Sequence, residues 1–109
     1  MKPLAALTLA CLTASGGSVQ AATEQVVLSC EAVYLPARST WVREVRFTLD
    51  ERRIRGVEID GVPVYSFSVF ETVLLTALDN ERIQLDTATL TWRSDFRGQA
   101  TSEGRCTRR

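Results

Sequence analysis

The chain has 109 residues, of which 45% are hydrophobic and 24% charged, with 13 basic side chains, 13 acidic ones and no histidine. This length allows one domain at most, and the balanced charge gives no strong field for nucleic acid or an anionic membrane. Without histidine there is no Ser-His-Asp or Cys-His catalysis, and the commonest general base and metal ligand is missing. We therefore expect no nucleic-acid partner, no metal and no cofactor.

The first 21 residues have the order of a secretory signal. Lys2 supplies a positive charge, residues 4–13 are uncharged and mostly apolar, and Val19-Gln20-Ala21 places small or apolar residues at −3 and −1 of a cleavage site. The apolar run is too short for a transmembrane helix, which needs about 20 residues. We expect cleavage near Ala21, a location in the periplasm or outside the cell, no transmembrane segment after cleavage, and one small β-rich domain at 22–109.

Three cysteines occur in the chain. Thr8-Leu9-Ala10-Cys11 is a loose match to a lipoprotein cleavage box. We expect Cys11 to be removed with the signal peptide, and the alternative is that Cys11 becomes a lipidated N-terminus. Cys30 and Cys106 remain, and a pair of cysteines in an exported chain predicts a disulfide. This bridge would span 76 positions, which is worth roughly 4–5 kcal/mol in the chain-entropy model.

Apolar and polar residues alternate from Trp41 to Leu49, which predicts a half-buried strand. A polar turn follows, and Gly56 stands where the alternation changes phase, which predicts a bulge. Asp60-Gly61 is a strong hairpin signal because glycine accepts positive φ. Pro63 suits an edge strand or a strand entry.

Alternation resumes at 65–69, and Asp79-Asn80 predicts another turn before a strand with Ile83 and Leu85. Residues 69–79 are ambiguous: their apolar spacing also fits a helix, but their β-branched side chains favour a strand that pairs with the next one. We predict an all-β fold, a small antiparallel meander of seven or so strands, barrel-like or sandwich-like, with one disulfide. The alternative is α+β with a helix at 69–79.

Five aromatic side chains follow the apolar phase, and we assign them to the core: Trp41, Phe47, Tyr65, Phe67 and Trp92. A core made from so short a chain leaves little for a deep pocket, and small-molecule sites usually need a cavity of about 300 Å³ or more. The sequence therefore predicts no such cavity.

Charged residues offer two candidate sites. Glu58 and Asp60 lie two apart on a predicted strand, so both carboxylates would share its solvent face. A hydrolase that uses only carboxylates is thus one alternative function, although exposed strand carboxylates usually serve solubility. Arg52, Arg53 and Arg55 form the tightest basic cluster and are the candidate partner-binding residues.

The C-terminal Arg105, Arg108 and Arg109 are expected to form a frayed polar end. The ending with Gly104-Arg105-Cys106 and residues 85–90 resembles that of small periplasmic β-domains, including the inhibitors of c-type lysozyme. The Ser-Gly-x-x-Tyr loop of those inhibitors is missing here, so no binding residue is carried over. The sequence predicts an exported, non-enzymatic domain that binds a protein partner, with inhibition of a hydrolase such as lysozyme as an alternative.

Overall fold

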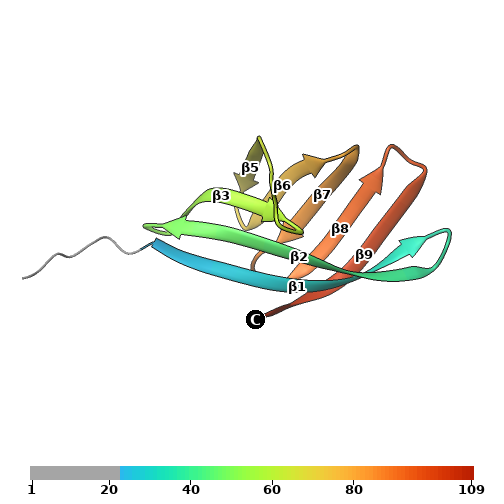
Figure 1. The fold of residues 1–109 in the computed structure, drawn as a ribbon, viewed down its shortest axis with the longest axis horizontal. Coiled ribbons are helices and arrows are strands. Elements are labelled where there is room, and N and C mark those ends of the chain that lie inside the picture. Colours follow the sequence, from blue (N-terminus) through green and yellow to red (C-terminus); the bar gives the residue numbers. More distant parts are fainter. Residues whose placement is uncertain (1–22) are drawn as a thin grey trace, which may run out of the picture.

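The computed structural model describes residues 23–109, which form one antiparallel sheet of nine strands with no helix in this part of the chain (Figure 1). The predicted signal segment and Cys11 lie outside the described residues. The strands are β1 (Thr23–Leu35), β2 (Ser39–Asp50), β3 (Arg53–Ile59), β4 (Val62–Pro63), β5 (Phe67–Phe70), β6 (Val73–Leu78), β7 (Glu81–Asp86), β8 (Thr91–Phe96) and β9 (Ala100–Arg108). Within residues 23–109, no helix is long and apolar enough to cross a membrane.

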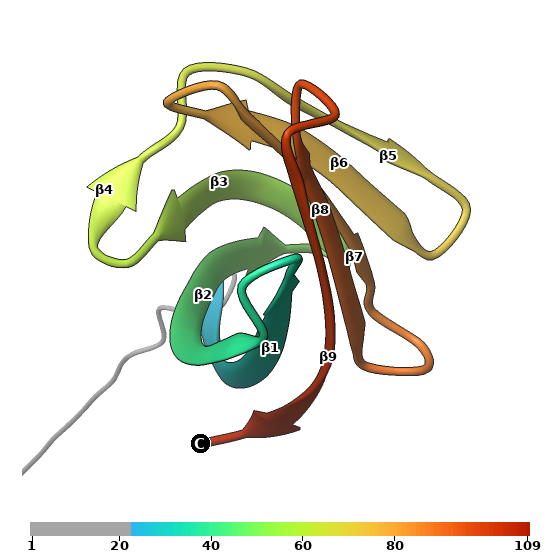
Figure 2. The same ribbon diagram turned by 90° about the vertical axis from the view of Figure 1, so that its right-hand side faces the viewer.

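The strand order is β4-β3-β2-β1-β9-β8-β7-β6-β5. Every strand pairs with its neighbours in the chain except β4 and β5, which follow one another in sequence but lie at opposite edges of the sheet. The first and last strands pair instead, from Leu28 opposite Arg108 to Leu35 opposite Thr101. The sheet curls into a half-barrel that stays open between its two edges (Figure 2). The predicted all-β antiparallel meander is confirmed.

Two consecutive residues in the left-handed region lie in four of the hairpin turns, at 51–52, 60–61, 79–80 and 97–98. Asp60 and Gly61 have φ values of 54° and 83°, and Asp79 and Asn80 have 52° and 71°. Two consecutive residues with positive φ match the right-handed twist of the flanking strands, as in type I′ turns. The bulge predicted at Gly56 is also confirmed, because Thr48 pairs with Gly56 whereas the next residue, Leu49, pairs with Ile54.

Residues 69–79 form strands, so the alternative helix is wrong. β5 ends at Phe70, and β6 runs from Val73 to Leu78 before the Asp79-Asn80 turn. Leu75 lies opposite Gln84 of β7 in the register expected from that turn. The stiff β-branched side chains and the turn chemistry therefore outweigh the helical spacing of the apolar residues.

The concave face of the sheet carries the core. Its buried apolar side chains are Val26, Leu28, Cys30, Ala32, Tyr34, Val45, Phe47, Val57, Ile59, Leu74, Ile83, Leu85, Trp92 and Cys106. Of the predicted aromatic core, Phe47 and Trp92 are buried and Phe67 is half-buried. Trp41 and Tyr65 were assigned wrongly. Trp41 is 59% exposed near the β1–β2 turn, where it packs on Tyr34, and Tyr65 lies fully exposed in the link between β4 and β5.

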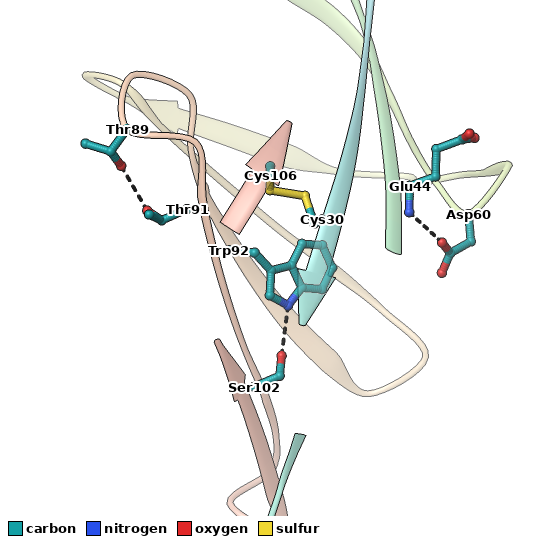
Figure 3. Close-up of a disulfide and its surroundings, with 8 residues drawn as sticks. All are labelled: Cys30, Glu44, Asp60, Thr89, Thr91, Trp92, Ser102 and Cys106. Carbon is teal, nitrogen blue, oxygen red and sulfur yellow. Dashed lines mark hydrogen bonds between the residues drawn. A yellow bond between two sulfur atoms is a disulfide. The ribbon is translucent and has the colours of Figure 1, made fainter. Parts of the chain in front are cut away.

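The predicted disulfide is confirmed and joins β1 to β9 (Figure 3). Cys30 and Cys106 lie directly opposite one another, with Cα atoms 3.9 Å apart. Trp92 packs nearby, and its indole N–H donates to the Ser102 hydroxyl at 2.8 Å. The bridge therefore fixes the pairing that holds the two halves of the meander together.

Candidate functional site

A polar network built on three buried side chains and one exposed carboxylate lies at one end of the half-barrel. We call Tyr34, Arg43, Asp60 and Glu81 the interior network. Arg43 Nη1 donates to both carboxylate oxygens of Glu81, at 2.8 and 3.1 Å, and also to the Tyr34 hydroxyl. Tyr34 in turn donates to Glu81 at 2.7 Å, and Arg43 Nε donates to Asp60 at 2.7 Å. The network crosses the interior from β2 to β7.

Each charge in this network is compensated by a partner. Burial opposes the guanidinium charge of Arg43, but hydrogen bonds to Glu81 and Asp60 outweigh it, so the pKa of Arg43 is raised above its ordinary value. Burial first, and then the hydrogen bond to Glu81, raises the pKa of the Tyr34 phenol. The Arg43 guanidinium also lies 5.1 Å from the centre of the Trp92 ring, within cation–π distance. Because its charged groups are paired with one another, we assign this network a structural role.

Glu58 and Asp60 do not share a strand face as expected. β3 ends at Ile59, so Asp60 belongs to the turn. Its carboxylate accepts the Arg43 Nε–H and, at 2.8 Å, the backbone N–H of Glu44. The geometry thus assigns Asp60 to the interior network and separates it from Glu58.

A cleft of about 540 Å³ occupies the opposite end of the half-barrel. We call it the seam cleft, because it lies where the start of β3 and the edge strand β5 face one another without pairing. Its buried apolar lining comes from Val26, Leu28 and Phe47. Its more exposed apolar lining comes from Leu49, Ile54, Phe67, Val69 and Leu90. The expectation that so small a domain would lack a cavity of this size is wrong, because the sheet does not close between β4 and β5.

Three arginines line the seam cleft: Arg52, Arg53 and Arg108. Within residues 23–109 none of them forms an ion pair. Arg55, the third member of the predicted basic cluster, is not in the lining and lies 3.7 Å from Asp50. The sequence cluster is thus divided, with two members at the cleft and one paired outside it.

The C-terminal arginines are not a frayed end. Arg108 is the last residue of β9 and lies opposite Leu28. Arg109 donates its backbone N–H to Val27 at 2.9 Å and its guanidinium N–H to Glu44 at 2.6 Å. Because β9 is the middle strand of the sheet and pairs with β1, this terminus is held in the sheet. Arg108 joins the cleft lining from a position far from Arg52 in sequence.

A second hollow of about 600 Å³ lies over strands β6 to β9. Its charges are balanced: Arg82 and Arg93 are matched by Asp95 and Glu103, and Arg93 lies 3.5 Å from Glu103. By contrast, Glu71 is the one carboxylate beside the three arginines of the seam cleft lining. The seam cleft therefore combines an apolar wall with an excess of positive charge, and we take it as the candidate binding site.

The strand phase of two charged residues in the sequence predicts the interior network, although the sequence analysis did not identify it. Arg43 lies between Trp41 and Val45 in the apolar phase of β2, and Glu81 has the phase of Ile83 and Leu85 in β7. A charge in the inward phase of a strand indicates a buried partner of opposite sign. For the seam cleft no such signal exists, because its lining comes from separate segments brought together by the curl of the sheet.

In residues 23–109 no group of three or more His, Cys, Asp or Glu side chains is arranged to hold a metal ion. Comparisons with protein-family models, with curated proteins and with solved structures find no match to the chain.

Proposed function

We propose that this chain is an exported, non-enzymatic binding protein and that the seam cleft is its binding site. One observation carries the proposal: the open edge of the half-barrel leaves a cleft of about 540 Å³ with an apolar wall and arginines that lack ion pairs within residues 23–109. Ligand sites in proteins are typically concave, mostly apolar and about 300–1,000 Å³ in volume, with a few polar groups that orient the ligand. The seam cleft has this size and composition.

An uncharged apolar fluorophore, N-phenylnaphthylamine, tests the proposal on purified, disulfide-intact protein. Binding should raise its fluorescence. Val69→Asp, in the cleft lining, should weaken binding, since it places a charge against an apolar ligand. Val42→Asp is the matched control. Val42 is also a strand valine and is 63% exposed, compared with 46% for Val69, but it is not part of the cleft. Absence of binding, or equal loss in both variants, contradicts the proposal.

Export is the second part of the proposal. It rests on the charged, apolar and small-residue segments of the first 21 residues. β1 begins at Thr23, so cleavage after Ala21 leaves all nine strands intact. N-terminal sequencing of protein from its native host should begin at Ala22 or Thr23. An intact Met1 or a lipidated Cys11 would contradict it.

A protein partner is the second candidate ligand. β5 is an edge strand that carries the exposed side chains of Val69 and Phe70, and edge strands can accept a further strand from another chain. Affinity capture from envelope extract with the wild type and with Phe70→Lys tests this: a partner lost only in the variant supports edge binding, and a partner retained by both contradicts it. Inhibition of a hydrolase and carboxylate-only hydrolysis stay predictions of the sequence.

A further inference from the structure

The apolar part of the seam cleft is not covered by the sheet itself. Leu49, Ile54, Phe67 and Leu90 pack against the core and stay only partly buried, and all four line the cleft. Because removing apolar surface from water is favourable, an apolar chain placed against these side chains would gain free energy. A purely polar ligand would not.

The charged part of the cleft lies in the same lining. Arg52, Arg53 and Arg108 have no ion pair within residues 23–109, whereas Arg55 and Arg109 outside the cleft each have an acidic partner. The lining residues include three arginines and one glutamate, so their formal charges sum to +2. Guanidinium groups bind carboxylates through paired, charge-assisted hydrogen bonds. The complementary ligand group is therefore an anion.

Arg52 also occupies a strained backbone position. It forms the β2–β3 turn with Glu51, and the two residues have φ values of 69° and 52°. Glycine or asparagine is favoured at such positions, since a Cβ atom is disfavoured in the left-handed region. Replacement of Arg52 by glycine should therefore preserve or improve the turn, which separates a binding role of the side chain from a structural one.

We propose that the seam cleft binds a long-chain fatty acid, with its acyl chain against the apolar wall and its carboxylate at the neighbouring Arg52 and Arg53. This inference rests on the proposed binding function and names its ligand class. The cleft volume of about 540 Å³ suits a single ligand of moderate size. A single-chain amphiphile with an anionic end is the simplest chemistry that uses both parts of the lining.

Displacement of N-phenylnaphthylamine by palmitate, kept below its critical micelle concentration, tests the inference. Cetyl alcohol has the same chain without the charge, and cetyltrimethylammonium has a charge of the opposite sign. Palmitate should bind at least about tenfold more tightly than either, since charge-assisted hydrogen bonds form with the carboxylate alone. Acetate, which has the carboxylate without the chain, should not displace the probe.

Three variants locate the carboxylate. Arg52→Gly and Arg53→Gln should each weaken palmitate binding about tenfold or more and leave cetyl alcohol binding unchanged. Arg55→Gln is the matched control, because Arg55 lies in the same hairpin outside the cleft and pairs with Asp50. Arg52→Gly should also have a melting temperature no lower than that of the wild type.

The outcomes separate the two proposals. Equal affinity for palmitate and cetyl alcohol, or unchanged palmitate binding in both cleft variants, would overturn the fatty-acid inference and leave the binding function standing. If no apolar probe binds to the cleft, both the binding function and the fatty-acid inference are overturned. Binding to vesicles of phosphatidylglycerol without displacement of the probe by palmitate would also overturn the inference, because the arginines would then bind a membrane surface.

Discussion

Replacement of Glu81 by leucine tests how strongly the interior network stabilises the fold. The Glu81 side chain is 4% exposed and accepts hydrogen bonds from Arg43 at 2.8 and 3.1 Å and from Tyr34 at 2.7 Å. Its removal leaves the Arg43 side chain, which is only 10% exposed, without this ion pair and the Tyr34 phenol without its acceptor. Breaking a buried ion pair from one side costs about 3–5 kcal/mol. Because Asp60 stays 2.7 Å from Arg43 Nε, we expect a loss near the lower end, about 3 kcal/mol.

Urea unfolding followed by tryptophan fluorescence measures this loss, because Trp92 is buried beside Arg43. With a slope of about 1.5 kcal/mol per molar urea, the midpoint should fall by about 2 M. Glu103→Leu is the control: the Glu103 side chain is 74% exposed, and its loss should change the free energy of unfolding by less than about 1 kcal/mol.

A triple variant, Tyr34→Phe with Arg43→Met and Glu81→Leu, should recover most of the stability. Buried ion pairs can often be replaced by apolar side chains of similar size without loss, and Asp60 is exposed enough to be solvated by water once Arg43 is gone. The reasoning is refuted if Glu81→Leu costs no more than Glu103→Leu, or if the triple variant is as unstable as the single one.

Three further predictions concern stability. Joint replacement of Cys30 and Cys106 by alanine should lower the free energy of unfolding by about 4.5 kcal/mol, since the bridge closes a loop of 76 positions; a denaturant titration that shows a loss below about 1 kcal/mol contradicts this. Gly104→Ala should abolish or severely weaken folding, because a Cβ at this position would lie 1.8 Å from a backbone oxygen of β1. Gly56→Ala is the control and should fold, because a Cβ at that position would have no atom within 4 Å. Circular dichroism of the two variants measures the difference. Because the pKa of Tyr34 is raised in the fold, its stabilising effect is complete below the unfolded pKa of about 10 and is lost as pH rises through the folded pKa; Tyr34→Phe should flatten the alkaline fall in stability measured by urea titration at each pH.

Local signals in the sequence predicted most of the fold. The alternation of apolar residues and the Asp60-Gly61 and Asp79-Asn80 turns set the strands and their registers, since turn geometry and side-chain phase act over a few residues. The errors at Trp41 and Tyr65 have one cause: phase reports which face a side chain is on, and not whether anything covers that face.

The candidate site was predicted only in part. Arg52 and Arg53 were singled out, but the sequence could not separate them from Arg55 or join them to Arg108. That division depends on the curvature of the sheet and on the unpaired edges, which are properties of the whole fold. The interior network was within reach of sequence reasoning, because strand phase places both Arg43 and Glu81 on the apolar face.

The pairing of β1 with β9 has a consequence for how the chain folds. All the other strand pairs join neighbours in sequence through short turns, and this pair alone joins strands separated by most of the described chain. Joining residue 109 to residue 23 through a linker of several residues, which spans the four positions from Val27 back to Thr23, and opening the chain at 64–66 would turn every pair into a local hairpin. Such a circular permutant has a lower contact order, so it should fold faster than the natural order. The same disulfide would then close a short loop and lose part of its entropic contribution.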